Sequence, residues 1–243
     1  NYSFQAALAG AVHTLRTQPN AWIEMGAGVI IAIFGWRGIF LAFVLFGLLS
    51  LGWLLVRQEE TLPSHRRRAL SAGNLWAALK EVVSNGEVML YTAAMTLGFG
   101  QMFALLSSIQ QIFDQTYHRG ASFPYWFALI ALVSASASFI NSRYVVRLGM
   151  RRLATLAYLG QVVLSLVMIT LFSLGLVTGT LAFACFFIWA NSIFFIAGLT
   201  FGNLNALAMQ KMGHIAGMAT SVISAISTVM AVVIAAPVGL AFD

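Results

Sequence analysis

Six long apolar runs separated by polar gaps constrain this chain more than any other feature of its sequence. They cover residues 38–56, 88–113, 123–142, 153–174, 181–202 and 215–242. A bilayer core needs about 20 apolar residues in a helix, and a backbone exposed to lipid must satisfy its own hydrogen bonds. The runs therefore predict an all-α polytopic membrane protein. Residues 21–34 form a shorter run that contains Glu24, so the prediction is six or seven transmembrane helices.

The composition excludes a water-soluble fold. Only 8% of the residues are charged and 60% are hydrophobic, whereas a soluble domain carries about 25% charged residues. The formal net charge is +6, but the basic residues lie in short loops rather than on one folded surface. We therefore expect contact with the lipid bilayer and its anionic headgroups, and no nucleic-acid partner.

The basic residues predict which loops face the cytoplasm. Eleven of the 13 Lys and Arg residues lie in every second gap, and the gaps in between hold only Arg37 and Arg119. Lys and Arg close to a membrane span are retained on the cytoplasmic side. The gap that ends at Arg152 and the gap that holds Lys211 are therefore predicted to face inward.

One gap, residues 57–87, has the composition of a soluble protein. It leads us to predict three parts: residues 1–56 as the end of an N-terminal bundle, 57–87 as a cytoplasmic linker, and 88–243 as a C-terminal bundle. Within the linker, apolar residues recur at helical spacing, which predicts a short amphipathic helix on the membrane surface. These residues are Leu75, Trp76, Leu79, Val82 and Val83.

The chain lacks the signatures of soluble enzymes. It has no phosphate-binding G-x-x-x-x-G-K loop, no G-x-S-x-G turn, and no Cys or His pair at metal-ligand spacing. The lone Cys185 lies in an apolar run and is expected to be a packing thiol. We expect no catalytic residues, no metal and no cofactor. A polytopic membrane enzyme would need acidic metal-binding pairs or a catalytic His near the interface, and neither is visible.

Polar residues inside the runs are the candidate functional residues, because an unpaired polar group in hydrocarbon is costly. Gln101, Ser108 and Gln111 fall roughly on one face of a helix, and Asn191 lies among aromatic residues that include Phe194. One interpretation is a cavity that binds amphipathic organic molecules. The other is hydrogen bonding between neighbouring helices. The sequence leaves both open.

Two further groups of small and polar residues predict close helix packing. Ser134, Ser136, Ser138 and Asn141 crowd one run. Gly213, Gly217, Ser221 and Ala225 recur every four residues in another, a spacing that lets helices approach closely.

Carboxylates are nearly absent from the runs. Glu24 is the only acidic residue well inside one, and Asp114 is placed at the outer end of another. A proton-coupled transporter needs a protonatable group in its pathway, so we expect that group to lie in other parts of the protein.

Three passages resemble the major facilitator superfamily, in particular its proton-coupled drug exporters of the bicyclomycin and chloramphenicol resistance type. Residues 35–40, Gly-Trp-Arg-Gly-Ile-Phe, resemble the turn into the sixth helix, and Glu-Thr-Leu-Pro at 60–63 followed by Arg66–Arg68 resembles the start of the central loop. Residues 142–152 resemble the loop motif G-x-x-x-D-R-x-G-x-R-R, which Arg147, Gly149, Arg151 and Arg152 match. Ser142 and Val146 depart from it, and residues 21–34 lack the antiporter proline.

The resemblance implies a major-facilitator-type bundle that is incomplete, covering about helices 5 to 11 of a longer protein. It implies a monomer in the bacterial inner membrane that exports small lipophilic molecules by alternating access, with protons as coupling ion. The loop residues, namely Arg143, Arg147, Gly149, Arg151 and Arg152, would help to stabilise one closed state, or would simply be retained on the inner side. The alternatives are a nutrient or metabolite importer of the same superfamily and a truncated pseudo-transporter that no longer transports.

Overall fold

The computed structural model describes residues 36–57 and 71–241. The chain divides into two units, one that ends at Arg68 and one that begins at Ala69, and each is described by itself. The shorter apolar run at residues 21–34 lies outside the described residues, so the seventh helix stays a prediction.

The described part of the first unit is one helix, α3, Trp36–Arg57. It matches the run predicted at residues 38–56. Its hydrophobic residues are spread around the whole helix, and the large ones from Phe40 to Val56 are exposed. A helix that is apolar on all sides is suited to lipid. At its basic end, the Arg57 guanidinium lies 5.3 Å from the centroid of the Trp53 ring.

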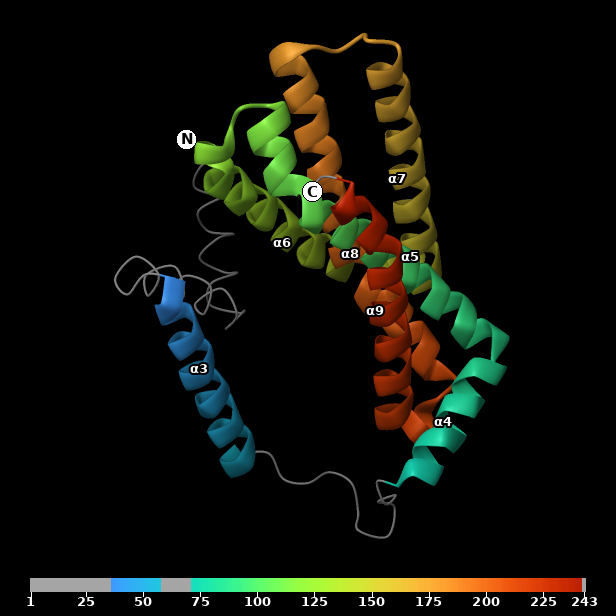
Figure 1. The fold of residues 1–243 in the computed structure, drawn as a ribbon. Coiled ribbons are helices and arrows are strands. Elements are labelled where there is room, and N and C mark those ends of the chain that lie inside the picture. The colour runs from blue at the N-terminus through green and yellow to red at the C-terminus, as the bar shows by residue number, and fades with distance from the viewer. Residues whose placement is uncertain (1–35, 58–70, 242–243) are drawn as a thin grey trace. The chain divides into compact units, whose positions relative to one another are not determined.

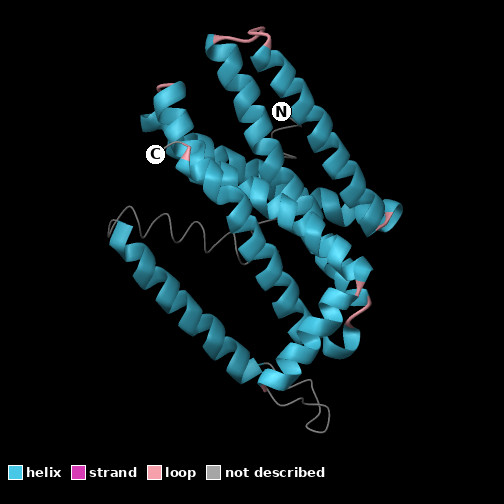
Figure 2. Cartoon of the chain, turned by 45° about the vertical axis from the view of Figure 1, so that its right-hand side comes forward, coloured by secondary structure: helices cyan, strands magenta, loops and turns pink. Residues whose placement is uncertain are grey.

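The second unit contains five long helices and one short one (Figure 1). They are α4 Ala72–Ser84, α5 Gly86–Gln111, α6 Phe123–Leu148, α7 Met150–Ser173, α8 Gly179–Gln210 and α9 Ala216–Leu240. A π-helical turn, Ile112–Thr116, continues α5. The described residues contain no strand (Figure 2).

The predicted fold class is confirmed. Six helices of the described residues are long and apolar enough to cross a membrane, and each coincides with one of the six predicted runs. The main difference is that α8 continues to Gln210, eight residues beyond the run predicted to end at Gly202. Asn203 stays in the helix because its amide nitrogen donates to the Leu199 carbonyl at 2.7 Å and to Asn141 Oδ1 at 2.6 Å.

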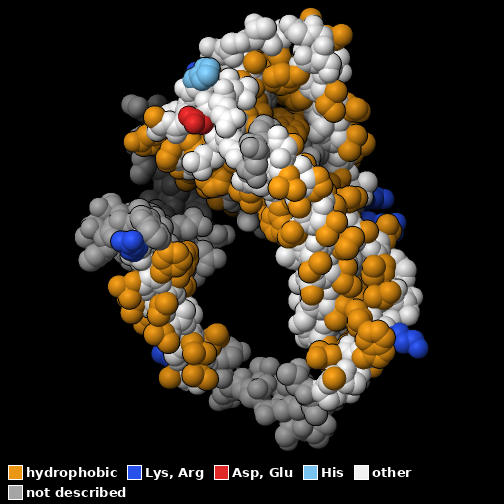
Figure 3. All heavy atoms as spheres, viewed as in Figure 1, with side chains coloured by type: hydrophobic (Ala, Val, Ile, Leu, Met, Phe, Trp, Pro, Cys, Tyr) orange, Lys and Arg blue, Asp and Glu red, His pale blue; other side chains and the backbone are white. Residues whose placement is uncertain are grey.

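Helix α5 lies at the centre of the packing. It packs most extensively against α9 and also against α8, and α8 in turn contacts α6 and α7. The five long helices alternate in direction, so the α6–α7 and α8–α9 junctions lie at the end of the unit where α5 begins. The arginines at residues 143–152 and Lys211 therefore share one end, as the positive-inside pattern predicts. Figure 3 shows hydrophobic side chains over much of the visible face of these helices.

The predicted amphipathic helix is confirmed as α4. Ser71 begins it, since its hydroxyl accepts a hydrogen bond from the Asn74 backbone at 3.2 Å. Ala78 and Val82 are buried against the neighbouring helices, whereas Trp76 is 67% exposed. Part of the apolar face thus packs onto the bundle. The location of the rest on the membrane surface stays a prediction.

The small-residue face predicted for α9 is not the face that this helix buries within the second unit. Gly217, Ser221 and Ala225 are exposed within the second unit, and the buried face is two residues further along the helix. Its members are Ala219, Ile223, Ser227, Ala231 and Ala235. Both faces have small residues every four positions, but the buried one also has a large side chain, Ile223, that fills the space between α9 and its neighbours. Small-residue spacing alone does not distinguish them.

On α6, close packing is confirmed at Asn141, which bonds to Asn203 of α8. One face of α6 also approaches α8 closely: a Cβ added at Gly198 would lie 2.9 Å from the Ala137 methyl. Ser136 instead lies on an exposed face and donates to the Val133 carbonyl of its own helix at 2.6 Å. The serines of this run therefore do not share one role.

Gly98→Ala is expected to destabilise the second unit. The new methyl carbon would lie 2.6 Å from the Tyr158 hydroxyl oxygen and 2.8 Å from Phe201 Cε1, and overpacking of this kind costs about 1–3 kcal/mol. A lower melting temperature of the detergent-purified protein would check this. Gly202→Ala is the matched control, because no atom lies within 4 Å of its added Cβ. Equal melting temperatures for the two variants would contradict the prediction.

Candidate functional site

A groove of about 590 Å³ runs along the second unit between α5, α7 and α9. Its walls are almost entirely apolar, and its polar lining residues are Gln101 of α5 with Tyr158, Gln161 and Ser165 of α7. The lining also includes Ala94, Leu97, Ala104, Val162, Leu166, Ile169, Ile234 and Val238. Many of these are exposed, so the groove opens sideways rather than along the helix axes.

The polar side chains on the α7 wall join that helix to α8. The Ser192 hydroxyl donates to Gln161 Oε1 at 2.9 Å, and Trp189 Nε1 donates to Ser165 Oγ at 3.0 Å. Gln161 is only 4% exposed, and its Nε2 has no hydrogen-bond partner among the described residues. Gln161 is not among the residues predicted from the sequence. It is the only amide in its apolar run, and the argument that selected Gln101 would have found it.

The predicted polar stripe on α5 is divided by the fold. Gln101 lines the groove, but Ser108 does not. Ser108 is 3% exposed, and its hydroxyl donates to the Ala104 carbonyl at 2.9 Å. Gln111 lies further along, at the last residue of α5. The three residues therefore do not line one cavity within the second unit.

The aromatic cluster occupies the end of the unit opposite the basic loops. Phe113 is fully buried in it and makes edge-to-face contacts with Phe123, Phe183 and Phe186. Its other rings are Tyr117, Trp126, Phe127, Phe187, Trp189 and Phe194. Phe194 meets Phe127 with ring centroids 6.0 Å apart. The predicted residue Phe194 is thus part of the aromatic packing between α6 and α8.

Two predicted carboxamides, one on α5 and one on α8, have an unpaired oxygen. Asn191 follows the fully buried Ala190, and Gln111 precedes Ile112 and Phe113 in the chain. Asn191 Oδ1 and Gln111 Oε1 are buried and accept no hydrogen bond from the described residues. Unsatisfied acceptors in an apolar interior cost about 1–3 kcal/mol each.

A cation covers the outer side of the cluster. The Arg119 guanidinium lies 4.3 Å from the Phe183 ring centroid and 5.9 Å from that of Trp126, within the range of cation–π attraction. Nearby, the Tyr117 hydroxyl donates to the Ala182 carbonyl at 3.4 Å. Burial raises the pKa of Tyr117 above its ordinary value, so this hydroxyl stays neutral at physiological pH.

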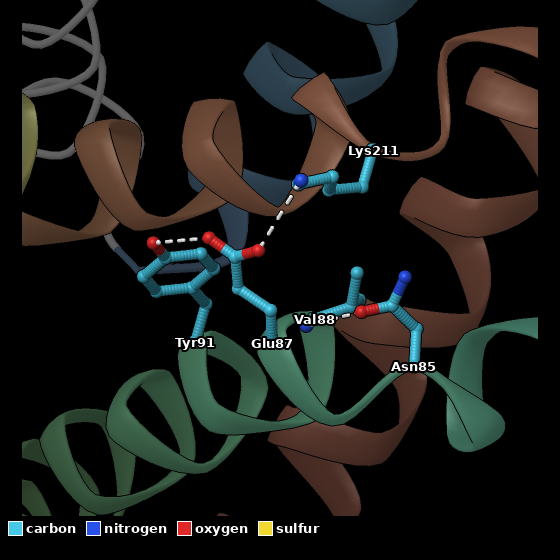
Figure 4. Close-up of polar contacts among 5 residues, drawn as sticks. All are labelled: Asn85, Glu87, Val88, Tyr91 and Lys211. Atoms are coloured by element: carbon cyan, nitrogen blue, oxygen red, sulfur yellow. Dashed lines mark hydrogen bonds and ion pairs between the residues drawn. The ribbon is translucent and has the colours of Figure 1, made fainter.

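The opposite end is held by polar contacts around the start of α5 (Figure 4). Asn85 Oδ1 accepts a hydrogen bond from the Val88 backbone at 3.1 Å and begins the helix. Glu87 pairs with Lys211 at 3.5 Å and accepts a hydrogen bond from the Tyr91 hydroxyl at 3.1 Å. These contacts connect the start of α5 to the end of α8.

A second pair at this end, between Glu81 of α4 and His214, has an N···O distance of 2.5 Å. It attaches the amphipathic helix to the α8–α9 turn. Both side chains are about half exposed, and exposed pairs of this kind contribute only about 0–1 kcal/mol. The pair thus orients α4 more than it stabilises the fold.

The loop predicted to have a gating role is the junction of α6 and α7. Gly149 is the single residue between these helices, with φ 79° and ψ 153°, a conformation that is essentially restricted to glycine. The junction also has four exposed arginines that form no ion pair within the described residues; they are Arg143, Arg147, Arg151 and Arg152. The backbone conformation therefore explains why the motif has a glycine at this position. The arginines form no ion pair within the described residues and remain available for other contacts.

In the described residues, no three His, Cys, Asp or Glu side chains come together as a metal site. Cys185 is a half-buried free thiol, in keeping with the packing role expected for it.

Comparison with known proteins gives a family match over most of the chain. The family is described as the Major Facilitator Superfamily, and the match covers residues 25–235. An uncharacterised MFS-type transporter, YdgK, of Bacillus subtilis is 26% identical over 88% of this chain and 52% of its own length. A bicyclomycin resistance protein homolog of Haemophilus influenzae is 26% identical over 82% of this chain and 49% of its own length. The chain thus spans about half the length of these curated relatives. No solved structure matches significantly.

Gly149→Ala is expected to strain the junction of α6 and α7. A side chain at φ 79° and ψ 153° costs about 1–3 kcal/mol, so the variant should accumulate less in the membrane and melt at a lower temperature. Gly160→Ala on α7 is the control, since it has open space and ordinary helical geometry. Wild-type stability of Gly149→Ala would show that the junction adopts another conformation.

Proposed function

The chain belongs to the Major Facilitator Superfamily, and on this premise we propose that it is part of a proton-coupled exporter of small lipophilic or amphipathic molecules. In this proposal residues 57–87 link two helical bundles, and the bundle that follows forms one wall of a substrate path. The protein acts as a monomer in the bacterial inner membrane and works by alternating access.

The observation that supports this substrate class best is the two unpaired carboxamide oxygens on α5 and α8, the helices that also contribute to the aromatic cluster. Gln111 Oε1 and Asn191 Oδ1 are both acceptors, so a ligand that satisfies them must donate through N–H or O–H groups. The neighbouring rings offer a large apolar surface, and aromatic faces attract cations. A lipophilic amine or amide has both an N–H donor for the carboxamide oxygens and an apolar body for the rings.

The distribution of charge supports the same class. In the described parts of the six spans, acidic and basic side chains lie only near the helix ends. A transporter of sugar acids or phosphorylated metabolites would need a cation inside the membrane to pair with the substrate. The absence of such a residue from the described spans favours neutral or cationic substrates over anions.

The direction of transport is proposed from one relative. The Haemophilus influenzae protein is named as a bicyclomycin resistance protein homolog, and resistance through a membrane transporter is most simply achieved by export. The group that couples export to protons is proposed to lie outside the described residues, because their spans hold no carboxylate away from the helix ends.

The arginines at the α6–α7 junction are proposed to act in gating. They are exposed and unpaired within the described residues, so they are free to contact carbonyl groups at helix ends or acidic groups of the other bundle when the inner side closes. Such contacts would stabilise one conformational state without touching the substrate.

Gln111→Ala and Asn191→Ala are expected to change substrate range without lowering membrane abundance. Each removes one acceptor, a loss of up to about 1.5 kcal/mol or about tenfold in affinity. In cells that express the full-length protein, resistance to lipophilic amines and amides should fall by up to this factor. Resistance to their quaternary ammonium and N,N-disubstituted amide analogues, which carry no N–H donor, should change little.

Ser136→Ala is the control, since its exposed hydroxyl bonds only within its own helix. Abundance is measured by immunoblot of the membrane fraction. Parallel loss of abundance and resistance in the two test variants would assign Gln111 and Asn191 to packing and leave the proposed substrate contacts without support.

Gln101→Ala is measured beside them, because Gln101 was predicted for the same cavity but lines the groove between α5, α7 and α9. A change in substrate range equal to that of Gln111→Ala would include the groove in the substrate path. An unchanged substrate range would separate the groove from the substrate path.

A further inference from the structure

Three hydrogen bonds between side chains join α7 to α8. The pairs are Trp189 with Ser165 at 3.0 Å, Ser192 with Gln161 at 2.9 Å, and Thr200 with Tyr158 at 3.4 Å. The α7 partners are three and four positions apart in the sequence, so they lie on one side of that helix. One face of α7 is therefore a polar edge that holds one face of α8.

Beyond its first residues, α7 has little apolar packing that could hold α8 in place. The buried residues of α7 are Leu153, Ala154 and Gln161, and the first two lie near its start. From Gln161 to the end of this described helix, no other side chain is buried. Val162 and Leu166, for example, are more than half exposed. The outer part of the α7–α8 contact thus depends on its polar pairs.

These pairs hold α8 on the side opposite to Asn191, the residue proposed to contact the substrate. At about 100° per residue, Asn191 points about 160° away from Trp189 and about 100° away from Ser192 on the same helix. A side chain at a radius of about 5 Å moves by about 2 Å when its helix turns by about 20°. Such a shift breaks a hydrogen bond of about 3 Å, so the rotation of α8 decides whether Asn191 reaches a donor.

Gln161 has a cost that a residue used only for packing would avoid. It is 4% exposed, and its Nε2 has no hydrogen-bond partner among the described residues, so its burial leaves a donor unsatisfied. A leucine or methionine would fill similar space without this cost. What the amide adds is a directed hydrogen bond, and its partner is Ser192, the neighbour of Asn191 in the chain.

We propose that Ser165 and Gln161 are positioning residues for the substrate contact at Asn191. They fix the rotation of α8 from its far side and so determine how well Asn191 Oδ1 meets an N–H or O–H donor. Their role rests on the proposed function, because it requires that Asn191 contacts the substrate. Helix α7 then influences substrate range without touching the substrate.

The test uses Ser165→Ala and Gln161→Leu in cells that express the full-length protein. Each should lower resistance to lipophilic amines and amides about threefold, the loss of one hydrogen bond between membrane helices. Resistance to the analogues without an N–H donor should change by less than about twofold, and membrane abundance should stay unchanged. Ser165→Thr keeps an acceptor for Trp189 and should restore resistance. Thr170→Val is the matched control, since it removes an α7 hydroxyl that bonds only to Leu166 of its own helix.

The double variant Ser165→Ala with Asn191→Ala separates this role from the proposed function. If Ser165 acts through Asn191, the double variant loses no more resistance than Asn191→Ala alone, because coupled residues are not additive. A further loss of about threefold would overturn the positioning role and leave the proposed function intact. So would a wild-type substrate range for Ser165→Ala and Gln161→Leu beside a changed range for Asn191→Ala.

Two other outcomes would overturn the positioning role for different reasons. A wild-type substrate range for Asn191→Ala alone would remove the proposed contact itself, and the proposed function would lose its support at the same time. Equal losses for substrates with and without an N–H donor, without rescue by Ser165→Thr, would assign Ser165 to helix packing.

Discussion

The absence of water inside a bilayer determines most of this structure. Each backbone group in a span must find a partner within the protein, and polar side chains do the same within their own helix. Thr92 donates to the Val88 carbonyl and Thr96 to the Thr92 carbonyl, at 2.8 and 2.9 Å. Contacts between helices then rely on close packing rather than on the exclusion of water. Several of the fully buried residues at these contacts, such as Ala137, Ala190 and Ala231, are small.

Against this background, the few polar atoms that stay unpaired are the most informative. The buried atoms without a partner in the described residues belong to Gln111, Ser134, Gln161 and Asn191. Two of them, on Gln111 and Asn191, lie on α5 and α8 and are the acceptors that we propose for the substrate. The Gln161 nitrogen belongs to a residue that lines the groove between α5, α7 and α9. The two ends of the second unit also differ in their contacts. Aromatic rings pack together at one end, and charged side chains form pairs at the other.

Much of the architecture could be predicted from residue type and spacing. All six spans, the amphipathic helix at residues 72–84, and the shared end of the basic loops follow from run length and charge. The site could be predicted only in part. Gln101, Ser108 and Gln111 share a helix face, but Gln101 lines a groove whereas Ser108 donates to a backbone carbonyl of its own helix. Spacing along one helix carries no information about what the other helices place against it.

The sequence by itself determined that the chain is helical, that it spans a membrane and which ends of its helices are basic, because these depend on local hydrophobicity and on charge. Only the tertiary structure decided which of the two small-residue faces of α9 is buried, that Asn203 continues α8 by bonding to Asn141, and that Gln161 faces the groove. Those outcomes depend on the shape and polarity of a partner helix. That partner is distant in sequence, and its position is defined only when the bundle has packed.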